Sequence, residues 1–409
     1  MKTVVNVCGV GPGSYDLMTA DVRKVIEDAD IVLTSIKDNE AIMALNADVR
    51  CLTVTEMLAF IGEEIGSENG RKLAVAASGD TGFHSIASSI VERFPKAEIC
   101  LHPGIGTISY FMAKTGKNYE DLKALSFHGI SGSAVPYVSY NEKVFCLTDN
   151  KVTPVTIAEE LVQAGLGDRV MMYVGEDLSS PDEKISCGTP DEMAGHEYSR
   201  LSVVYVENPS VPDRFRTLKD DDFMRGGVPM TKEEVRTLVI SGLDVHPGDT
   251  VYDVGAGTGS VTAGLAYRAC EGEVYAIEVE PEGAELIRTN SEKLGAFNIK
   301  VIEGRAPEIL EGLPAPDKVF IGGSKGNLRE IVTCCLEKNP GALIVLTTVT
   351  LDTLTEALRL ADELELRRDI VCINVSRAGK MGSYDLMKAE NPVYIIKLMK
   401  EQGEENQCL

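Results

Sequence analysis

The sequence lacks several features that would place it in particular classes of protein. No apolar run in its 409 residues approaches the roughly 20 residues that a membrane-spanning helix needs. The N-terminal stretch "MKTVVNVCGVGPG" enters a strand-like pattern directly, without the apolar core or the cleavage site of a secretory signal. We therefore expect no membrane partner and a cytoplasmic location.

Basic charge is also scarce. The chain has 40 Lys and Arg residues against 63 Asp and Glu residues, which gives a formal net charge of −23. Much of this imbalance fits a simple demand for solubility. It also repels phosphate backbones, and no block of basic and aromatic residues offsets it. We expect no nucleic-acid partner, and an anionic small molecule would need a local basic patch.

The cysteines and histidines do not have the spacings of metal sites. The ten cysteines are scattered, none forms a Cys-x-x-Cys pair, and most lie inside predicted strands as small apolar residues. The five histidines show no metal-ligand spacing either. The sequence thus predicts neither disulfides nor a metal ion.

What the sequence does contain is a regular alternation. Runs typical of strands alternate with runs typical of helices, which indicates an α/β protein with parallel sheets. In the first half, the expected strands cover 3–10, 29–34, 72–78, 97–103, 124–129, 143–149, 169–175 and 200–207. In the second half, they cover 250–256, 273–279, 299–304, 317–323, 342–349, 370–376 and 392–399. The last two have no obvious helix between them, so this mostly parallel sheet should finish in an antiparallel pair.

The domain division follows from composition. The length allows two domains or three. Residues 207–229 are rich in Pro, Gly and Asp and have no apolar periodicity, so they are the expected linker. This leaves one domain over 1–206 and another over 230–400. The polar residues 401–409 are expected to form a disordered tail.

A glycine turn marks the second half. In "DVGAGTGSV", Asp253–Val261, the turn follows a β-branched strand and precedes a run with helical spacing. Its glycines allow the backbone to approach a ligand and point amide groups of the helix start toward it. The dinucleotide fingerprint would need its third small residue at position 260, where this chain has a serine and the glycine comes one residue earlier. The spacing therefore favours a ligand other than a dinucleotide.

An acidic residue supports this interpretation. Glu278 ends the next expected strand, about twenty residues further on, where a carboxylate can accept the hydroxyls of a ribose. A glycine turn and a ribose acid without a phosphate-specific residue suit a nucleoside that carries an amino acid, such as S-adenosylmethionine. An ordinary NAD site of a dehydrogenase is the alternative.

The second half also resembles a known family. The segments "VPMTKEEVR", "YDVGAGTGSVT", "VYAIEVEPEGAELIRTN", "VIEGRAPEIL", "PDKVFIGGSKGNLREI" and "NPVYIIK" occur in the order typical of the decarboxylating methyltransferase domain of corrin biosynthesis, over about 225–400. The resemblance implies a class I Rossmann-like methyltransferase with a seven-stranded sheet. It also implies donor contacts at Thr231, Gly255, Ala256, Gly257, Thr258, Gly259, Glu278, Arg305 and Ala306, with Glu278 on the ribose and Ala306 near the adenine.

Two of these segments allow structural alternatives. Thr231 and Glu234 have the spacing of a capping box ahead of the apolar residues that begin at Val235. In "IGGSKGNL", two glycines and a serine at a helix start can bind a carboxylate, which a precorrin carries in number. We therefore assign substrate contacts to Gly322, Gly323, Ser324 and Lys325, with Arg329 in support; the alternative is a simple tight loop.

A glycine-bearing stretch near the end of the chain offers further charges. Arg377 and Lys380 lie in "SRAGKMGS", residues 376–383, which we expect to be a flexible loop that covers the substrate. The alternative is that both side chains are simply solvated.

The first half resembles a different family. The segments "VNVCGVGPGSYDLMTADVRKVIEDADIVL", "ASGDTGFHSIASSI", "LHPGIGTISYFMAKTG", "SFHG" and "VFCLTDNKVTPVTIAEEL" are similar to those of the tetrapyrrole methylases, most closely the carbon-5 methyltransferases of the corrin pathway. The resemblance implies two α/β lobes with the methyl donor in the cleft between them. It assigns donor contacts to Pro12, Asp80, Phe83, Gly106 and Thr107.

Some residues of this half depart from the family or allow another role. Thr81 replaces a usual proline, and Gly106 with Thr107 replaces a common pair of serines, so one hydroxyl is lost. The alternative role for Asp80 is an N-cap on the helix through Ile86. His128 is a candidate for the cleft, or a strand-end histidine with a structural role.

Together the two resemblances imply one chain with two S-adenosylmethionine-dependent C-methyltransferases. They would act on carbons 5 and 15 of a precorrin or cobalt-precorrin and remove carbon dioxide from the ring C acetate. An electron-rich carbon of the substrate is the nucleophile, so the protein mainly positions reactants in a dry site and no catalytic residue is assigned. A homo-oligomer is expected from the family. The alternatives are an RNA methyltransferase, an NAD-dependent dehydrogenase and a sensor that binds the donor without turnover.

Overall fold

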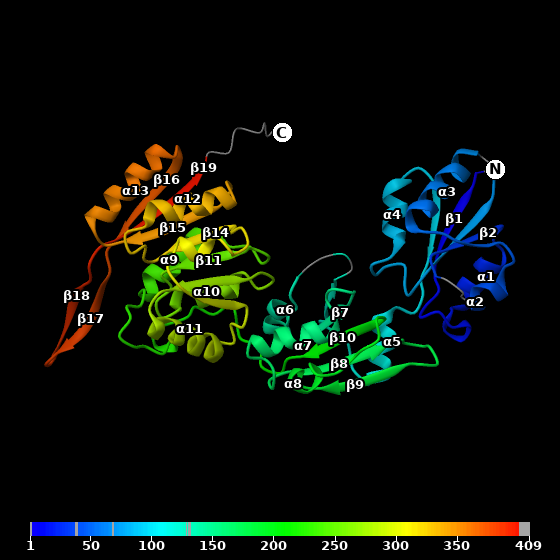
Figure 1. Cartoon of the computed structure of the whole chain (residues 1–409), viewed down its shortest axis with the longest axis horizontal. Coiled ribbons are helices and arrows are strands. Elements are labelled where there is room, and N and C mark those ends of the chain that lie inside the picture. Colours follow the sequence, from blue (N-terminus) through cyan, green and yellow to red (C-terminus); the bar gives the residue numbers. More distant parts are fainter. Residues whose placement is uncertain (1, 37–39, 68, 128, 130–131, 401–409) are drawn as a thin grey trace. The chain divides into compact units, whose positions relative to one another are not determined.

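The structure is a computed structural model that describes residues 2–400 except 37–39, 68, 128 and 130–131. The chain forms two compact units (Figure 1). The first comprises Met1–Gly132, Lys143–Ala158 and Met171–Glu207, and the second Ser133–Glu142, Glu159–Val170 and Asn208–Leu409. The predictions for His128 and for a tail at 401–409 fall outside the described residues.

A parallel sheet begins the first unit. Its order is β3-β2-β4-β1-β5, with β1 Val4–Gly9, β2 Ile31–Thr34, β3 Val49–Cys51, β4 Lys72–Ala77 and β5 Glu98–His102. Buried side chains of α1 (Ala20–Glu27) and α2 (Glu40–Leu45) pack on one face. Those of α3 (Val54–Ser67) and α4 (Ile86–Arg93) pack on the other. Both faces are covered, which explains why the central strands read as continuous apolar runs.

A second sheet of the first unit is mostly antiparallel. Its order is β6-β7-β10-β8-β9, with β6 Lys123–Ser126, β7 Lys143–Leu147, β8 Met171–Glu176, β9 Lys184–Gly188 and β10 Ser202–Glu207. Only β6 and β7 pair in parallel among these strands. The remaining helices of the chain's first half are α5 Thr107–Thr115, α6 Val135–Tyr140, α7 Pro154–Gln163 and α8 Pro190–Met193. The short edge strands β3 and β9 were not predicted, because their partly exposed residues give no continuous apolar run.

The second unit contains a seven-stranded sheet. Its order is β13-β12-β11-β14-β15-β19-β16, with β11 Val251–Val254, β12 Val274–Glu278, β13 Ile299–Glu303, β14 Lys318–Ile321, β15 Leu343–Thr348, β16 Leu366–Ile373 and β19 Val393–Lys400. The five strands β11 to β15 pair in parallel, and β19 runs antiparallel to both β15 and β16. The predicted strand count and the antiparallel end are therefore confirmed.

Helices cover both faces of this sheet. Buried residues of α12 (Leu328–Lys338) and α13 (Leu351–Glu363) pack with Val319 and Ile321 on one face. Those of α9 (Glu233–Leu243) and α10 (Ser260–Arg268) pack with Phe320 on the other. α11 (Pro281–Leu294) connects β12 to β13. Because β14 pairs in parallel with β11 and β15, the carboxyl ends of these strands lie together at one edge of the sheet.

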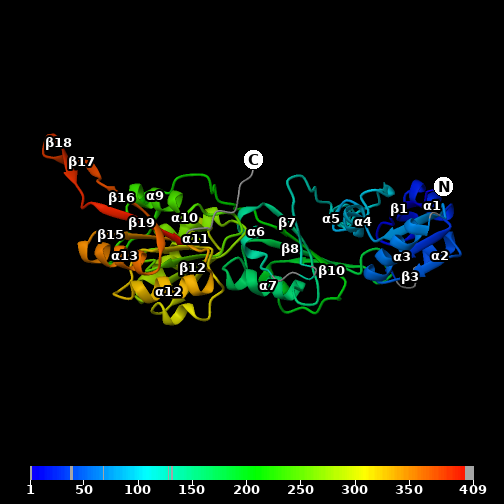
Figure 2. The same ribbon diagram turned by 90° about the horizontal axis from the view of Figure 1, so that it is seen from above.

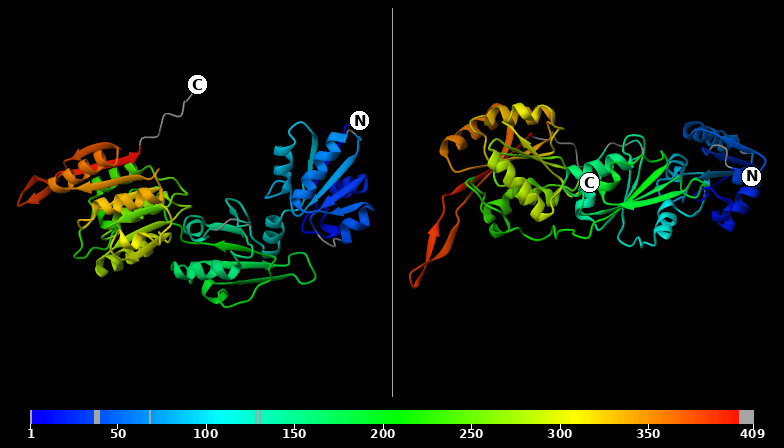
Figure 3. Two further views of the ribbon diagram at one scale, coloured as in Figure 1. Left: turned by 45° about the horizontal axis from the view of Figure 1, so that its top comes forward. Right: turned by 60° about the horizontal axis from the view of Figure 1, so that its bottom comes forward.

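A β-hairpin replaces the flexible loop that was expected at 376–383. β17 (Ser376–Met381) pairs antiparallel with β18 (Tyr384–Ala389), and Figures 2 and 3 show the pair extending away from the seven-stranded sheet. Gly382 in the two-residue turn has a φ of 66°, which glycine adopts without strain. The loop prediction was wrong because both strands are mostly exposed, so their sequences lack the alternation of apolar and polar residues that predicts a strand.

Part of the stretch expected as a linker is packed. A short 3-10 helix covers Asp220–Asp222, and Leu218 and Phe223 join the core around α9 and α10. Arg236 of α9, 1% exposed, donates to an Asp220 carboxylate oxygen at 3.1 Å and to the Leu218 carbonyl at 2.7 Å. The middle of this stretch is thus held by buried contacts in the second unit.

Candidate active site

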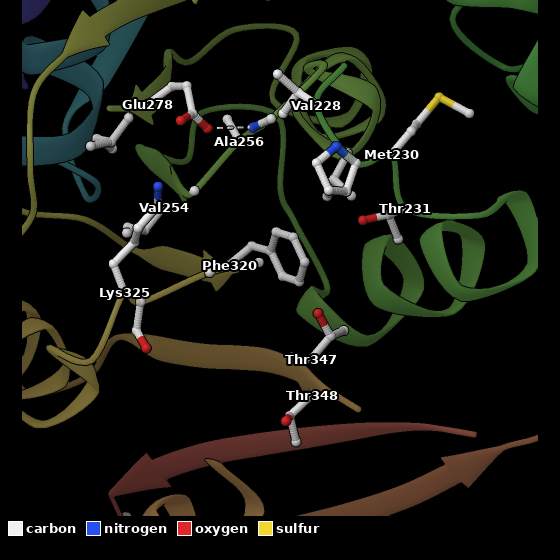
Figure 4. A pocket seen from close by; sticks show the side chains of 18 of the residues that line it. Val228, Met230, Thr231, Val254, Ala256, Glu278, Phe320, Lys325, Thr347 and Thr348 are labelled. Atoms are coloured by element: carbon white, nitrogen blue, oxygen red, sulfur yellow. Dashed lines mark hydrogen bonds between the residues drawn. The ribbon is translucent and has the colours of Figure 1, made fainter. Parts of the chain in front are cut away.

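A cavity of about 820 Å³ opens where the parallel strands of the second unit end (Figure 4). Residues that follow β11, β12, β14 and β15 contribute to its wall, together with the segment before α9. The predicted residues in the lining are Thr231, Gly255, Ala256, Gly257, Glu278, Arg305, Ala306, Gly322, Gly323, Ser324 and Lys325. Eleven predicted residues from five segments of sequence therefore meet at one cavity.

The glycine turn forms one wall of the cavity, and its backbone conformation requires glycine at three positions. Gly255, Gly257 and Gly259 have φ values of 73°, 58° and 76°, a region that other residues rarely adopt. A Cβ on Gly255 would lie 2.6 Å from the carbonyl oxygen of Gly323. The turn is thus packed closely against the loop after β14, and four of its five amides donate to the carbonyls of Ile277 and Ala256 or to the Glu278 carboxylate. Thr258 and Gly259 lie behind this wall rather than among the lining residues.

Glu278 fixes the turn through backbone amides. Its carboxylate accepts from the amides of Gly257 at 2.7 Å, Val279 at 2.8 Å and Glu280 at 2.9 Å. The residue is 5% exposed and lies in the cavity wall (Figure 4). A carboxylate offers about four acceptor positions, so one stays available to a ligand hydroxyl.

A second acid lies behind the turn. Asp253 is fully buried, and one of its carboxylate oxygens accepts from the Thr262 hydroxyl at 2.6 Å. Among the residues that the structure describes, its other oxygen and the buried Thr258 hydroxyl have no hydrogen-bond partner. Burial raises the pKa of Asp253 to about 7. The negative charge of Glu278 also raises this pKa, whereas the hydrogen bonds from Thr262 lower it. The acid therefore titrates near neutral pH.

The loop after β14 brings cationic groups to the rim. Lys325 pairs with Glu280 at 2.6 Å, and its carbonyl accepts from the Arg305 guanidinium at 3.1 Å. α12 begins only at Leu328, after an Asn327 N-cap. The prediction that Gly322 and Gly323 lie at a helix start was therefore wrong. The expected supporting residue Arg329 pairs with Glu363 and is not part of the lining.

The segment before α9 differs from its prediction. The helix begins at Glu233, and its N-cap is Lys232, without a side-chain cap. The predicted capping box of Thr231 with Glu234 was therefore wrong. The N-cap lies one residue later, and Glu234 binds Arg377 instead. Thr231 lines the cavity, and its carbonyl accepts from Arg236 at 2.8 Å.

The two cations of the 376–383 segment do not reach the cavity wall. Arg377 on β17 donates to both carboxylate oxygens of Glu234, at 3.0 and 2.5 Å, and approaches Asp220 at 3.4 Å. Lys380 lies 3.7 Å from Asp385 of the paired strand and is exposed. Neither side chain belongs to the lining, so a covering loop formed by them is not what the structure shows.

Other lining residues were missed by sequence reasoning. They are polar and come from the end of β15, from the residues before β19 and from the N-cap of α9: Thr347, Thr348, Glu390, Asn391 and Lys232. Lys232 lies 3.6 Å from Glu390. The signal was available for the threonines, because ligands of open α/β sheets bind beyond the carboxyl ends of the strands.

The predicted residues of the first unit also meet. Asp80 accepts from the amides of Gly104 at 3.0 Å and Gly82 at 2.9 Å. A Cβ on Gly106 would lie 3.5 Å from the Asp80 Cβ, and one on Gly79 would lie 3.7 Å from the Thr107 hydroxyl. The N-cap of α4 is Ser85, so the alternative role of Asp80 as that cap was wrong. Asp80 instead joins the turns that follow β4 and β5.

Two further predicted residues flank this group. The turn that carries Pro12 is bound to the one before Asp80 by a bridge between Gly11 and Gly79, with amide-to-carbonyl distances of 3.0 and 2.8 Å. The Pro12 carbonyl accepts from the Ser179 hydroxyl at 2.9 Å. Phe83 packs edge-on against His84 with ring centroids 4.6 Å apart. The turns that follow β1 and β4 are thus held together by backbone hydrogen bonds, and the Asp80 carboxylate binds the turn that follows β5.

The last two features concern metal binding and membrane spanning. No group of three or more metal-ligating side chains occurs in the described part of the chain. No helix within the described ranges is both long and apolar enough to cross a membrane.

Comparisons with known proteins bear on both units. A family model described as tetrapyrrole (corrin/porphyrin) methylases matches residues 4–194, and one described as a precorrin methyltransferase domain matches 221–400. The precorrin-6Y C(5,15)-methyltransferase [decarboxylating] of Sinorhizobium sp is 31% identical over 339 residues, which cover 81% of this chain and 80% of that protein. The chain belongs to this family.

Further relatives of the precorrin-6Y C(5,15)-methyltransferase family match one half each. A probable cobalt-precorrin-6B C(15)-methyltransferase (decarboxylating) of Pyrobaculum calidifontis is 39% identical and covers 46% of this chain and 94% of its own length. A crystal structure of a precorrin-6y C5,15-methyltransferase from Geobacter metallireducens is 37% identical, with a TM-score of 0.43, and covers 45% of this chain and 96% of that one. The two family models and the Sinorhizobium relative show that the chain is a methyltransferase, and methyltransferases of this family use S-adenosyl-L-methionine.

Proposed function

We propose that this chain methylates carbons 5 and 15 of a precorrin or cobalt-precorrin and releases carbon dioxide from the ring C acetate, in cobalamin biosynthesis. The observation that carries the proposal is the Sinorhizobium relative named for both carbons, which spans most of both units at 31% identity. The second unit, a class I Rossmann-like methyltransferase in this proposal, would act on carbon 15. The first, a two-lobed tetrapyrrole methylase, would act on carbon 5.

The cavity of the second unit fits a methyl donor beside an acceptor. The donor, S-adenosyl-L-methionine, supplies a methyl group on a sulfonium. The glycine turn from Gly255 to Gly259 lets a ligand approach its backbone closely, and Glu278 keeps an acceptor position for a hydroxyl. In this proposal Thr231, Arg305 and Ala306 complete the donor contacts. A volume of about 820 Å³ leaves room for part of a second molecule.

The remaining wall fits an acceptor with carboxylates. In this proposal Lys325, Arg305 and Lys232, which lie at the cavity, meet the carboxylates of the substrate. Lys325 and Lys232 then exchange their present partners, Glu280 and Glu390, for those carboxylates. Gly322, Gly323 and Ser324 add backbone and hydroxyl groups beside Lys325. Arg377 stays a weaker proposal for substrate contact, because Glu234 and Asp220 already occupy its guanidinium.

The protein's part in the reaction is positioning and exclusion of water. Val254, Ile277 and Phe320 give the cavity an apolar floor, which holds reactants together and strengthens electrostatic contacts. Methylation of carbon 15 releases one proton, and replacement of the acetate carboxylate by hydrogen consumes one, so these two steps balance. Methylation of carbon 5 releases a further proton, which passes to the solvent.

In the first unit, Pro12, Asp80, Phe83, Gly106 and Thr107 are proposed to contact a second donor molecule. The support is their convergence on the turns after β1, β4 and β5. We retain two catalytic domains over 1–206 and 230–400, joined through 207–229. A homo-oligomer and a cytoplasmic location also stay proposals from the sequence, and light scattering of the purified chain tests the first.

The decisive experiment measures both products of one enzyme. The purified chain, given methyl-labelled donor and the precorrin or its cobalt complex, should incorporate two methyl groups and release carbon dioxide. Glu278→Ala should abolish methylation of carbon 15 and spare carbon 5. Loss of both activities would contradict the division of labour. Methylation of RNA or reduction of a nicotinamide instead would contradict the proposed function.

A further inference from the structure

A partly buried ionic network in the first unit contacts two of the three segments that carry the proposed donor residues. Its centre is Glu183, in the segment before β9, whose side chain is 17% exposed. The carboxylate accepts from the Tyr110 hydroxyl at 2.6 Å, the Lys114 ammonium at 2.8 Å and the Ser179 amide at 2.6 Å. These three donors come from two separate segments of the chain.

One side of the network holds the start of α5. Tyr110 and Lys114 lie on this helix, about one and two turns after Thr107. Gly106, the N-cap of α5, lies against Asp80. A carboxylate that binds two successive turns of α5 therefore limits how the helix start moves relative to Asp80.

The other side holds the Pro12 turn. The Ser179 amide donates to the Glu183 carboxylate. The Ser179 hydroxyl donates to the carbonyl of Pro12, 167 positions away in the sequence, at 2.9 Å. Ser179 has a φ of 66°, a left-handed conformation that a serine keeps only where its surroundings fix it. Glu183 provides that fixation through the amide.

The charge of Glu183 is stable under assay conditions. Burial alone would raise the pKa of Glu183, but hydrogen bonds from Lys114, Tyr110 and Ser179 hold it at about 2. The group is thus a permanent anion between a cation, a phenol and an amide, and charge-assisted hydrogen bonds of this kind are the strong ones.

We infer that Glu183 is a positioning residue for the donor site of the first unit, acting through Ser179 on the Pro12 turn and through Tyr110 and Lys114 on α5. The inference rests on the proposed function of that unit. Glu183→Gln keeps the shape but replaces one acceptor oxygen with an amide donor, which faces donors that it cannot satisfy. The Pro12 turn and the start of α5 then lose a common anchor.

The chain offers a matched control. Glu207, at the end of β10, accepts from Lys117 at 2.7 Å, Tyr205 at 2.9 Å and Tyr173 at 3.3 Å. This is the same chemistry, a carboxylate bound by one lysine and by phenols. None of its partners in the described structure is bonded to a proposed donor residue. Glu207→Gln therefore reports the structural cost of breaking such a network alone.

The test compares Glu183→Gln, Ser179→Ala and Glu207→Gln in the full chain. KM for the donor and kcat are measured at carbon 5, with carbon-15 methylation and thermal unfolding recorded in the same preparations. We expect Glu183→Gln to raise the donor KM at carbon 5 about tenfold, Ser179→Ala by a smaller factor, and Glu207→Gln to leave it unchanged. Carbon-15 kinetics should stay the same in all three.

Two outcomes would overturn the inference. One is a carbon-5 donor KM in Glu183→Gln equal to that of Glu207→Gln. The other is a loss confined to thermal stability, with both sites equally affected. If the unaltered chain fails to methylate carbon 5 while carbon 15 reacts, the proposed function of the first unit fails instead, and the two failures are thus distinguishable.

Discussion

The two proposed donor sites place a carboxylate on backbone amides in similar ways, but their surroundings differ. In the second unit Glu278 binds the amide of Gly257, 21 positions away, and those of its own two successors. In the first unit Asp80 binds the amide of Gly104, 24 positions away, and that of its second successor, Gly82. The turn before Asp80 is also bridged to the turn that carries Pro12, whose carbonyl accepts from Ser179, 167 positions away. The glycine turn of the second unit is visible as a short motif, whereas the Ser179 contact is seen only in the folded chain.

The largest expected effect would break the second site and leave the first intact. In Gly255→Ala the new Cβ would meet the Gly323 backbone at 2.6 Å, at a φ of 73° that alanine disfavours. We expect carbon-15 methylation to fall by about 100-fold or more, since small displacements of reactants cost that much. Carbon-5 methylation should be unchanged in the same assay.

Gly116→Ala is the control for backbone strain alone. Gly116 has a φ of 67°, and a Cβ there meets nothing within 4 Å. It should lower thermal stability slightly, by about 1 kcal/mol, with both activities retained. Equal losses in the two variants would mean that the tight packing of Gly255 on Gly323 is unimportant.

The second effect tests the first site by the same logic. Asp80→Ala removes the acceptor for the Gly104 and Gly82 amides, so the turns after β4 and β5 lose their common bond. We expect carbon-5 methylation to fall by about 10- to 100-fold, because the partly buried Gly104 amide loses its partner and the proposed contacts with the methyl donor are displaced. Carbon-15 methylation of the same preparation is the reference, and a parallel loss there would argue against two independent sites.

The last prediction concerns the pH dependence of stability and involves the smallest change in methylation. Because burial raises the pKa of Asp253 to about 7, the folded chain keeps a proton that the unfolded chain loses near pH 4. Its contribution to stability is therefore full below about pH 4 and is lost as the pH rises to about 7. At about 1.4 kcal/mol per pKa unit, this amounts to a few kcal/mol.

Asp253→Asn carries no such proton. The unfolding midpoint of the unaltered chain should fall relative to that of Asp253→Asn between pH 5 and pH 8. The exposed Asp352, replaced by Asn, serves as the control. A constant difference between the unaltered chain and Asp253→Asn across this range would contradict the perturbed pKa.

Sequence reasoning reached the parts of the molecule that local patterns encode. The central strands, the seven-stranded sheet and the glycine turn follow from apolar runs and from conformations that only glycine adopts easily. Cap positions were less accurate, since Lys232 rather than Thr231 caps α9. A cap depends on which side chain finds a competing partner, and Glu234 finds Arg377 on β17.

The rest depends on long-range contacts. The pairing of Lys232 with Glu390 at the cavity and the Ser179 bond to Pro12 join segments that no periodicity relates. The β17–β18 hairpin was readable from its Gly-Ser turn, but its exposed residues gave no apolar alternation.

The buried pair of Arg236 and Asp220 decides where this chain can be divided. A fragment that starts at residue 230 would keep the guanidinium but lose its counterion and the Leu218 carbonyl, along with two apolar residues of the core. An unpaired buried cation is among the most costly defects a fold can carry. A separately produced second half should therefore begin no later than Asn208, so that Leu218, Asp220 and Phe223 travel with it. Such a fragment would still lack Ser133–Glu142 and Glu159–Val170, the parts of the second unit that include the core residue Tyr140.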